Sequence, residues 1–285
     1  GGLYVPQVVQ DLRRWLMYTN ENTSFQSIAG TVTSALINEE FSPIICEKIA
    51  TEAFPFSPEL KQLDDNFFAI ELFHGYTGCH RDFGVSYLCA CMETILTMKG
   101  GKAILLDYTS GELGALLART LRGKKNIKAV LVCQKGGYRG LTDSDLVWNG
   151  GNIYPVEVDD SPAACKKILN EVFQDKEFVS KYSLTVANTA NLCRLLGHVF
   201  YYPFAFSRIK DKVQGDIYYA LAPGNYANLV AGLYSWRFAL PLGGFILPST
   251  GSLTTDVKGN TLMLDSMVDV EKRTKASASD PANLE

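Results

Sequence analysis

Several features are missing from this sequence of 285 residues, and each absence narrows the kind of protein it encodes. No apolar run approaches the roughly 20 residues that a membrane-spanning helix requires, so we expect no membrane partner. The formal net charge is only −3, which argues against a dedicated nucleic-acid surface. No signal peptide is visible, and we expect a cytoplasmic protein. What is present is an ordinary globular composition, with 47% hydrophobic and 20% charged residues.

The chain has seven cysteines, an odd number, so they cannot all be paired in disulfides within one chain. Most lie inside apolar stretches such as residues 87–92, which is typical of small buried side chains in a reducing compartment. The alternative is a metal site built from Cys79, His80, Cys89 and Cys91. On a helix, Cys89 and Cys91 would point to different faces, and no second Cys/His pair follows them. We therefore predict no metal site.

The first 66 residues are predicted to form a helical N-terminal region. An apolar pattern over residues 12–16 has the spacing of one helix face. Thr23 or Ser24 can cap a second helix, and Pro43 can start a third.

Strand and helix patterns alternate from residue 66 onward. This alternation implies βαβ units, which build largely parallel sheets covered by helices. Strands are expected at residues 66–73, 103–106, 127–133, 152–158, 184–187, 217–222 and 244–247, and helices at 111–122, 161–173, 188–209 and 225–240.

The segment from residue 71 to residue 84 carries the strongest functional signal. It reads Glu-Leu-Phe-His-Gly-Tyr-Thr-Gly-Cys-His-Arg-Asp-Phe-Gly. It resembles a segment of the threonine synthases that reads E-L-F-H-G-P-T-L-A-F-K-D-F-G. In that family the lysine forms a Schiff base with pyridoxal phosphate, and the matching position here is Arg81.

Four further segments resemble motifs of the same family in the same order. Residues 1–6 resemble G-G-L-Y-V-P, and residues 109–114 resemble T-S-G-D-T-G. Residues 187–194 resemble A-N-S-I-N-x-x-R, and residues 223–228 resemble S-G-N-F-G-N, the turn that cradles the cofactor phosphate. The resemblance covers almost the whole chain, and the family is expected to have further residues at both ends.

This resemblance implies the α/β architecture of fold type II pyridoxal-phosphate enzymes, with two open, largely parallel sheets covered by helices and an extra helical N-terminal region. It implies a larger domain from residues 67–84 and 166–285, and a smaller inserted α/β domain from residues 85–165. It also implies the cofactor pyridoxal phosphate, held by Gly224, Asn225, Ala227 and Asn228. Residues that would line the cleft or contact substrate are Thr77, Ser110, Gly111, Glu112, Asn188, Asn191 and Arg194.

Departures from the family pattern fall on the residues that handle the cofactor. A guanidinium stays charged and is a poor nucleophile, so Arg81 cannot replace a lysine in imine formation. Pro223 has no N–H to donate, and Ala227 adds a Cβ that can obstruct a close approach or a positive φ. The alternative interpretation is that residues 223–228 form only a tight strand-to-helix turn. We predict that the cofactor is not bound covalently.

Glu112 stands where the family has aspartate, and its charge suits Arg81. We predict that Arg81 and Glu112 pair across the former cofactor site, each neutralising the buried charge of the other. Asp82 is expected to serve the fold alone, and His198 is expected to be a packed or surface residue and not a base. Arg194 lies six residues after Asn188, and it can also be read as a solvated or paired arginine near a helix cap.

Three functions follow as hypotheses. The first is a threonine synthase-like protein that has lost its cofactor chemistry and acts as a non-catalytic partner or binds a small anionic metabolite. The second is an active threonine synthase that converts O-phosphohomoserine to threonine and phosphate. The third is an enzyme of another class that uses the same cleft through Cys79, His80 and Arg81, since cationic groups can activate a thiol. Association into a homo- or hetero-oligomer is also expected.

Overall fold

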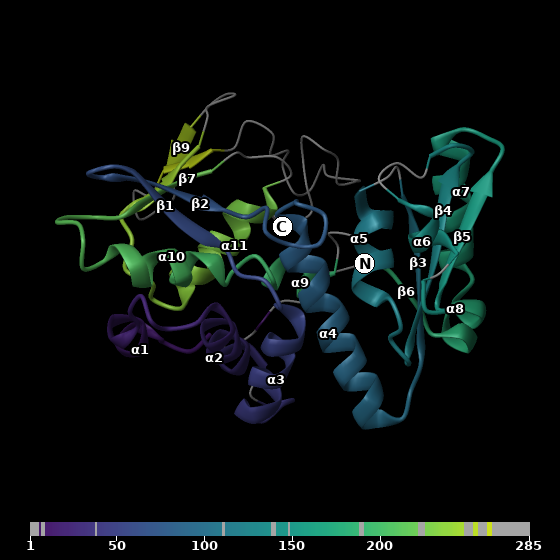
Figure 1. The fold of residues 1–285 in the computed structure, drawn as a ribbon, viewed down its shortest axis with the longest axis horizontal. Helices are drawn as coiled ribbons and strands as arrows, with labels where there is room; N and C mark the ends of the chain where they lie inside the picture. The colour runs from purple at the N-terminus through teal and green to yellow at the C-terminus, as the bar shows by residue number, and fades with distance from the viewer. Residues whose placement is uncertain are drawn as a thin grey trace.

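The computed structural model describes most of the chain and places its elements in two packed bodies joined by a long central helix (Figure 1). The described residues are 6, 9–37, 39–109, 112–137, 141–147, 149–187, 191–221, 226–247, 253–255 and 261–263. Within them, no helix is both long and apolar enough to cross a membrane.

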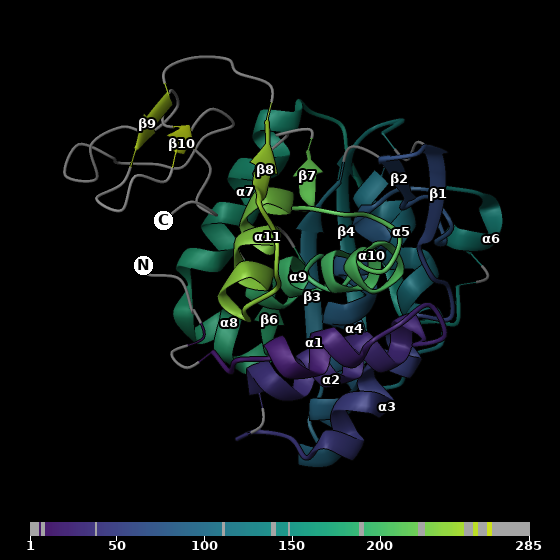
Figure 2. The same cartoon turned by 90° about the vertical axis from the view of Figure 1, so that its left-hand side faces the viewer.

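Three helices gather at one end of the molecule, as Figures 1 and 2 show. They confirm the helices predicted near residues 12, 24 and 43. Ser24 lies just before the second helix and its hydroxyl accepts a bond from the N–H of Ser27 at 3.1 Å, and Pro43 begins the third helix after the N-cap residue Ser42. Their bounds are α1 Arg13–Tyr18, α2 Phe25–Ile37 and α3 Pro43–Ala53.

Residues 59–64 form a strand, although the sequence analysis placed them in the helical N-terminal region. This strand, β1 (Glu59–Asp64), pairs antiparallel with β2 (Phe67–Glu71), so that Glu59 lies opposite Glu71. The sequence of β1 hid its character, because five of its six residues are exposed and the strand therefore shows no apolar face.

A four-stranded parallel sheet in the order β5-β4-β3-β6 forms the second body. Its strands are β3 Ala103–Tyr108, β4 Ile127–Gln134, β5 Ile153–Val158 and β6 Leu184–Thr185, and its helices are α5 Glu112–Leu121, α6 Asp143–Leu146, α7 Pro162–Gln174 and α8 Lys176–Tyr182. The strands and helices alternate as predicted, and Ser161 caps α7 by accepting a bond from the N–H of Ala164 at 3.2 Å.

Helix α4 (Arg81–Lys99) contributes side chains to the cores on both sides. Phe83 and Tyr87 pack into the aromatic core with the N-terminal helices, whereas Val85 and Leu88 pack into the core beneath the sheet. The whole segment from Asp82 to Cys91 is buried, so the two bodies share α4 as a common wall.

The single long helix predicted for residues 188–209 is wrong for the described part. Two helices stand there instead, α9 (Leu192–Leu196) and α10 (Tyr201–Ile209). The break follows Gly197, which touches the backbone of α4: a Cβ at Gly197 would lie 2.6 Å from the carbonyl oxygen of Phe83. The close approach of the two backbones lies at the turn between α9 and α10. An apolar periodicity in the sequence does not reveal such a contact.

The last described elements are β7 (Tyr218–Ala220), α11 (Ala227–Arg237) and β8 (Gly244–Ile246), followed by β9 (Leu253–Thr255) and β10 (Thr261–Met263). Strands β7 and β8 form a second, short parallel sheet, and β9 pairs antiparallel with β10. The molecule is therefore a mixed α/β protein with parallel sheets and covering helices. The predicted division into domains at residues 85 and 165 stays a prediction.

Candidate anion-binding cleft at the start of helix α4

Arg81 is the first residue of α4, and its side chain is exposed. The residues just before it, from Thr77 to His80, line a pocket of about 470 Å³ together with Leu72 and Phe73. His80 is the N-cap residue of this 19-residue helix. The N-cap residue of a long helix thus lines this pocket, and Arg81 follows it directly in the chain. A helix N-terminus and an arginine both favour a negatively charged ligand.

Thr77 directs its polar groups toward the protein and not toward the pocket. Its backbone N–H donates to Asp82 Oδ2 at 2.9 Å, and its hydroxyl donates to Asp82 Oδ1 at 2.6 Å. Asp82 is fully buried. A Cβ at Gly75 would lie 2.4 Å from Asp82 Oδ2, so the loop folds tightly around this carboxylate. Both hydrogen bonds of Thr77 serve the loop, and its predicted role toward substrate stays a prediction.

Arg194, on α9, is buried beneath the same region, with only 8% of its surface exposed. Its Nη1 donates to the carbonyl oxygen of Ala187 at 2.7 Å, and the N–H of Ala187 donates to Asp107 Oδ2 at 2.6 Å. Burial lowers the pKa of Arg194, the charge of Arg81 lowers it further, and Asp107 opposes both effects. Arg81 and Arg194 therefore lie within electrostatic reach of each other.

His198 is buried and shares one acceptor with a tyrosine. Tyr201 donates its hydroxyl to Asn228 Oδ1 at 2.7 Å, and His198 Nδ1 lies 3.1 Å from both the Tyr201 oxygen and Asn228 Oδ1. Because the tyrosine proton goes to Asn228, His198 Nδ1 carries the hydrogen and donates. Burial, followed by the effect of nearby His80, lowers the pKa of His198 to about 3. His198 is thus a packed, neutral residue, as predicted.

The turn before α11 is described only from Tyr226 onward. Tyr226 has a positive φ of 59°, and Ala227 begins the helix. The positive φ next to this helix thus falls on a tyrosine and not on Ala227. Asn228 engages Tyr201 and His198 through its side chain, and Tyr202 donates its hydroxyl to the Asn228 carbonyl.

Several predicted site residues lie outside the described part of the structure, namely Ser110, Gly111, Asn188, Pro223, Gly224, Asn225 and the side chain of Glu112. The pairing of Arg81 with Glu112 stays a prediction. Its description as a pair of buried charges is wrong for Arg81, which is exposed. Asn191 is half-buried and caps α9 by accepting a bond from the N–H of Cys193 at 3.1 Å.

Two residues of the site were missed by the sequence analysis. Asp107 is the last residue but one of an apolar strand, and a lone carboxylate after four apolar residues was the available signal. Tyr201 lies three residues after His198, but no spacing rule links it to Asn228, which follows it by 27 residues. Both side chains are buried, which only the fold reveals.

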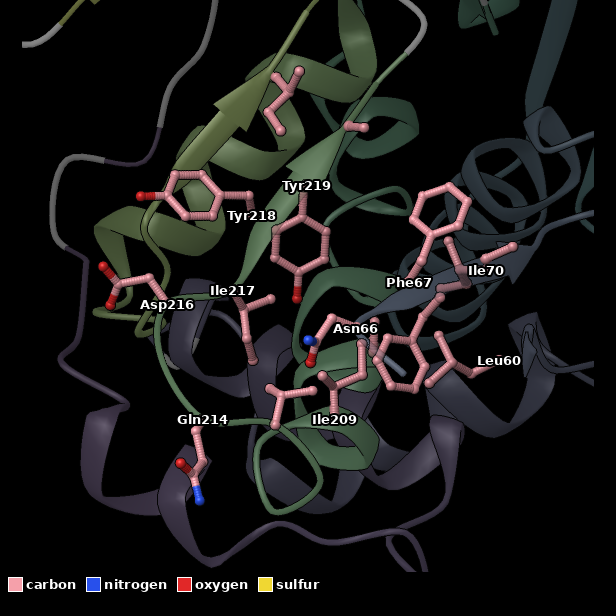
Figure 3. A pocket seen from close by; sticks show the side chains of 16 residues that line it. Leu60, Asn66, Phe67, Ile70, Ile209, Gln214, Asp216, Ile217, Tyr218 and Tyr219 are labelled. Carbon is pink, nitrogen blue, oxygen red and sulfur yellow. The ribbon is translucent and has the colours of Figure 1, made fainter. Parts of the chain in front are cut away.

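Two other features lie outside this site. A pocket of about 570 Å³ between β2, α10 and β7 has a mainly apolar wall, and no predicted site residue lines it (Figure 3). On the β1–β2 hairpin, Glu59, Glu71 and His74 place ligand-type atoms within 4.8 Å of one another. Lys61 donates to Glu59 at 2.7 Å, so we interpret this group as an ion-pair network.

Comparison with known proteins links this geometry to a family. The chain is 34% identical over 217 residues to the threonine synthase of Buchnera aphidicola subsp. Acyrthosiphon pisum, a match that covers 73% of this chain and 50% of that protein. It is 29% identical over 256 residues to that of Haemophilus influenzae, which covers 89% of this chain and 59% of that protein. The chain thus spans about half the length of the curated relatives it matches. No family model matches it.

Solved structures agree. The chain resembles a pyridoxal phosphate-bound threonine synthase from Brucella melitensis with a TM-score of 0.77 and 25% identity over 87% of this chain and 55% of that one. It resembles the threonine synthase of Escherichia coli with a TM-score of 0.67 and 28% identity over 85% and 56%. The architecture is that of the fold type II pyridoxal-phosphate enzymes. Within that class, the chain is a homologue of the threonine synthases.

Proposed function

We propose that this threonine synthase homologue does not hold pyridoxal phosphate through a Schiff base, and that its cleft binds a small anion non-covalently. The motif from residue 71 to residue 84 aligns Arg81 with the family's lysine. A guanidinium has no amine that can lose its proton and attack an aldehyde, so Arg81 does not fit a covalently held cofactor. No catalytic step through that cofactor follows from these residues.

The observation that carries the anion proposal is the placement of Arg81 and Arg194. Arg81 is exposed at the start of a long helix, beside the pocket formed by Thr77 to His80. Arg194 is buried where α9 crosses α4, since a Cβ at Gly84 would lie 2.4 Å from its carbonyl oxygen, and the charge of Arg81 lowers its pKa. A bound anion at this point would interact favourably with both guanidinium groups and with the helix N-terminus.

Reductive trapping tests the first half of the proposal. The protein is mixed with pyridoxal phosphate, reduced with borohydride and digested, and the peptides are searched for a pyridoxyl group on lysine. We expect no specific adduct in the native protein. Arg81→Lys supplies the amine and is expected to give an adduct at position 81, whereas the matched variant Arg81→Gln is expected to give none. A specific adduct on another lysine of the native protein would refute this half.

Calorimetric titration with sulfate tests the second half. Sulfate keeps its charge across the working pH range, so its binding reports the charge of the site alone. We expect saturable binding that weakens about tenfold or more in Arg81→Gln, which removes one charge-assisted contact. Lys167→Gln, which removes the same single positive charge from an exposed residue of α7, serves as the control for net charge. Equal binding by the native protein and Arg81→Gln would contradict the proposed site.

An active threonine synthase is the second candidate, and the homology to that family favours it. This activity requires an amine from elsewhere in the chain to form the Schiff base, because Arg81 cannot supply one. Turnover of O-phosphohomoserine, measured as released phosphate, decides between the candidates. The Cys79 alternative has weaker support, because Cys79 Sγ lies 3.8 Å from His80 Nδ1, a contact that does not by itself make a nucleophile.

A further inference from the structure

A chain of hydrogen bonds connects the sheet to the buried arginine of the proposed anion site. The carboxylate of Asp107, near the end of β3, accepts from the N–H of Ala187 at 2.6 Å, and the carbonyl of the same residue accepts from Arg194 Nη1 at 2.7 Å. All three residues are buried, with exposed fractions of 4%, 0% and 8%. Residue 187 therefore links a carboxylate on its N–H side to a guanidinium on its carbonyl side.

This arrangement fixes both the place and the electrostatic surroundings of the arginine. The short bond to a charged carboxylate holds the backbone at residue 187, and that backbone holds one nitrogen of the guanidinium. The carboxylate also interacts favourably with the guanidinium, as its opposing effect on the pKa of Arg194 shows. Asp107 can in this way change the electrostatic potential at the anion site without touching the ligand.

We propose that Asp107 is a positioning residue for Arg194, which it holds in place through Ala187. When Asp107 is ionised, its negative charge also weakens the attraction of Arg194 for an anion. This inference rests on the proposed anion site. Asp107 lies outside the motif of residues 71–84. Anion binding would then depend on the protonation of a carboxyl group that does not contact the ligand.

The direction of the pH dependence follows from the charges around Asp107. Burial raises the pKa of Asp107 to about 6, while the bond from Ala187 and the charge of Arg194 oppose this shift. Cys89 of α4 also faces Asp107, and burial raises the pKa of its thiol to about 12, so it stays neutral. Arg81 and Arg194 keep their charge throughout. Below about pH 6, Asp107 is protonated, its negative charge is lost, and anions are expected to bind more tightly.

Sulfate titrations between about pH 5 and about pH 7.5 test the proposal. We expect the affinity of the native protein to fall by about fivefold or more as pH rises, the lower range of coupling between two sites. In Asp107→Asn the affinity is expected to stay high and to lose this dependence. His80→Gln removes an imidazole from the pocket lining, so it is expected to change the affinity but to keep its fall with rising pH. The same pH dependence in Asp107→Asn as in the native protein would overturn the proposal.

A second measurement separates this inference from the anion site itself. The amide proton of Ala187 reports its bond to Asp107, so its NMR shift is expected to titrate near pH 6 in the native protein and not in Asp107→Asn. Absence of sulfate binding together with this titration would refute the anion site and support the link from Asp107 to Ala187. Sulfate binding together with an Ala187 shift that does not titrate would support the site and refute the link.

Discussion

Thr77 gives both of its hydrogen-bond donors to one buried carboxylate: its N–H and its hydroxyl bond to the two oxygens of Asp82 at 2.9 and 2.6 Å. This pair closes the loop that leads into α4 and sets where Arg81 begins the helix. The retained residues of the motif thus hold the loop in shape, while Arg81 at its end faces solvent.

Removing the hydroxyl of Thr77 should therefore weaken the fold. Thr77→Val keeps the shape of the side chain and the N–H bond, but leaves one oxygen of a buried carboxylate without its donor. We expect a loss of about 1 to 3 kcal/mol in the free energy of unfolding, measured by urea denaturation. Thr51→Val is the matched control, because the Thr51 hydroxyl bonds to the carbonyl of Glu47 on an exposed helix face, and we expect it to cost less than about 0.5 kcal/mol. Equal losses in the two variants would contradict the role of Asp82.

The crossing of α4 and α9 depends on glycine at position 84. A Cβ there would lie 2.4 Å from the carbonyl oxygen of Arg194 and 2.5 Å from His198 Nε2. Gly84→Ala should therefore push the helices apart and lower the free energy of unfolding by about 1 to 3 kcal/mol or more. Gly101→Ala is the control, since its Cβ would meet only the end of the Leu96 side chain at 3.2 Å. A Gly84→Ala protein as stable as the control would show that the crossing can relax.

The sequence predicted the class of fold and most strands of the parallel sheet, because apolar runs such as residues 103–106 and 129–133 are buried or half-buried in the sheet. It failed where tertiary contact overrides local pattern. Strand β1 has no apolar face, and the interruption between α9 and α10 begins at Gly197, which makes a close contact with the backbone of α4 that no periodicity reveals. For the same reason, motif comparison found Arg81 and Arg194 but missed Asp107, whose role depends on a bond to a residue 80 positions away.

The stability of the protein should depend on pH through Asp107. Its pKa is about 6 in the folded protein and about 3.9 in an unfolded chain, so the unfolded state gives up the proton first as pH rises. Stability from this group is fully present below about pH 4 and is lost as pH rises toward 6, by about 2 to 3 kcal/mol at most. Asp107→Asn should remove this loss. The difference in free energy of unfolding between Asp107→Asn and the native protein should grow from about pH 4.5 to about pH 7; a constant difference would contradict it.

Burial keeps His198 neutral, although the bond that Asn228 accepts from it favours the charged imidazole and raises its pKa. Burial holds the pKa of His198 at about 3, and Asn228 Oδ1 accepts from both His198 and Tyr201. In Asn228→Asp a carboxylate replaces the amide and can pair with an imidazolium, so the pKa of His198 should rise well above 3. The chain has only three histidines, and NMR titration of their ring signals, assigned with His74→Gln and His80→Gln, measures the change.

Asn228→Ala provides the complementary test of this bond. It removes the acceptor shared by two buried groups, which lie 3.1 Å from each other, and it should lower the free energy of unfolding by about 1 to 3 kcal/mol while His198 stays neutral. A His198 signal that titrates near its ordinary pKa in the native protein would refute the buried, neutral state. An unchanged pKa in a folded Asn228→Asp protein would refute the contact with Asn228. The two variants therefore separate the effect of burial on His198 from the effect of its hydrogen-bond partner.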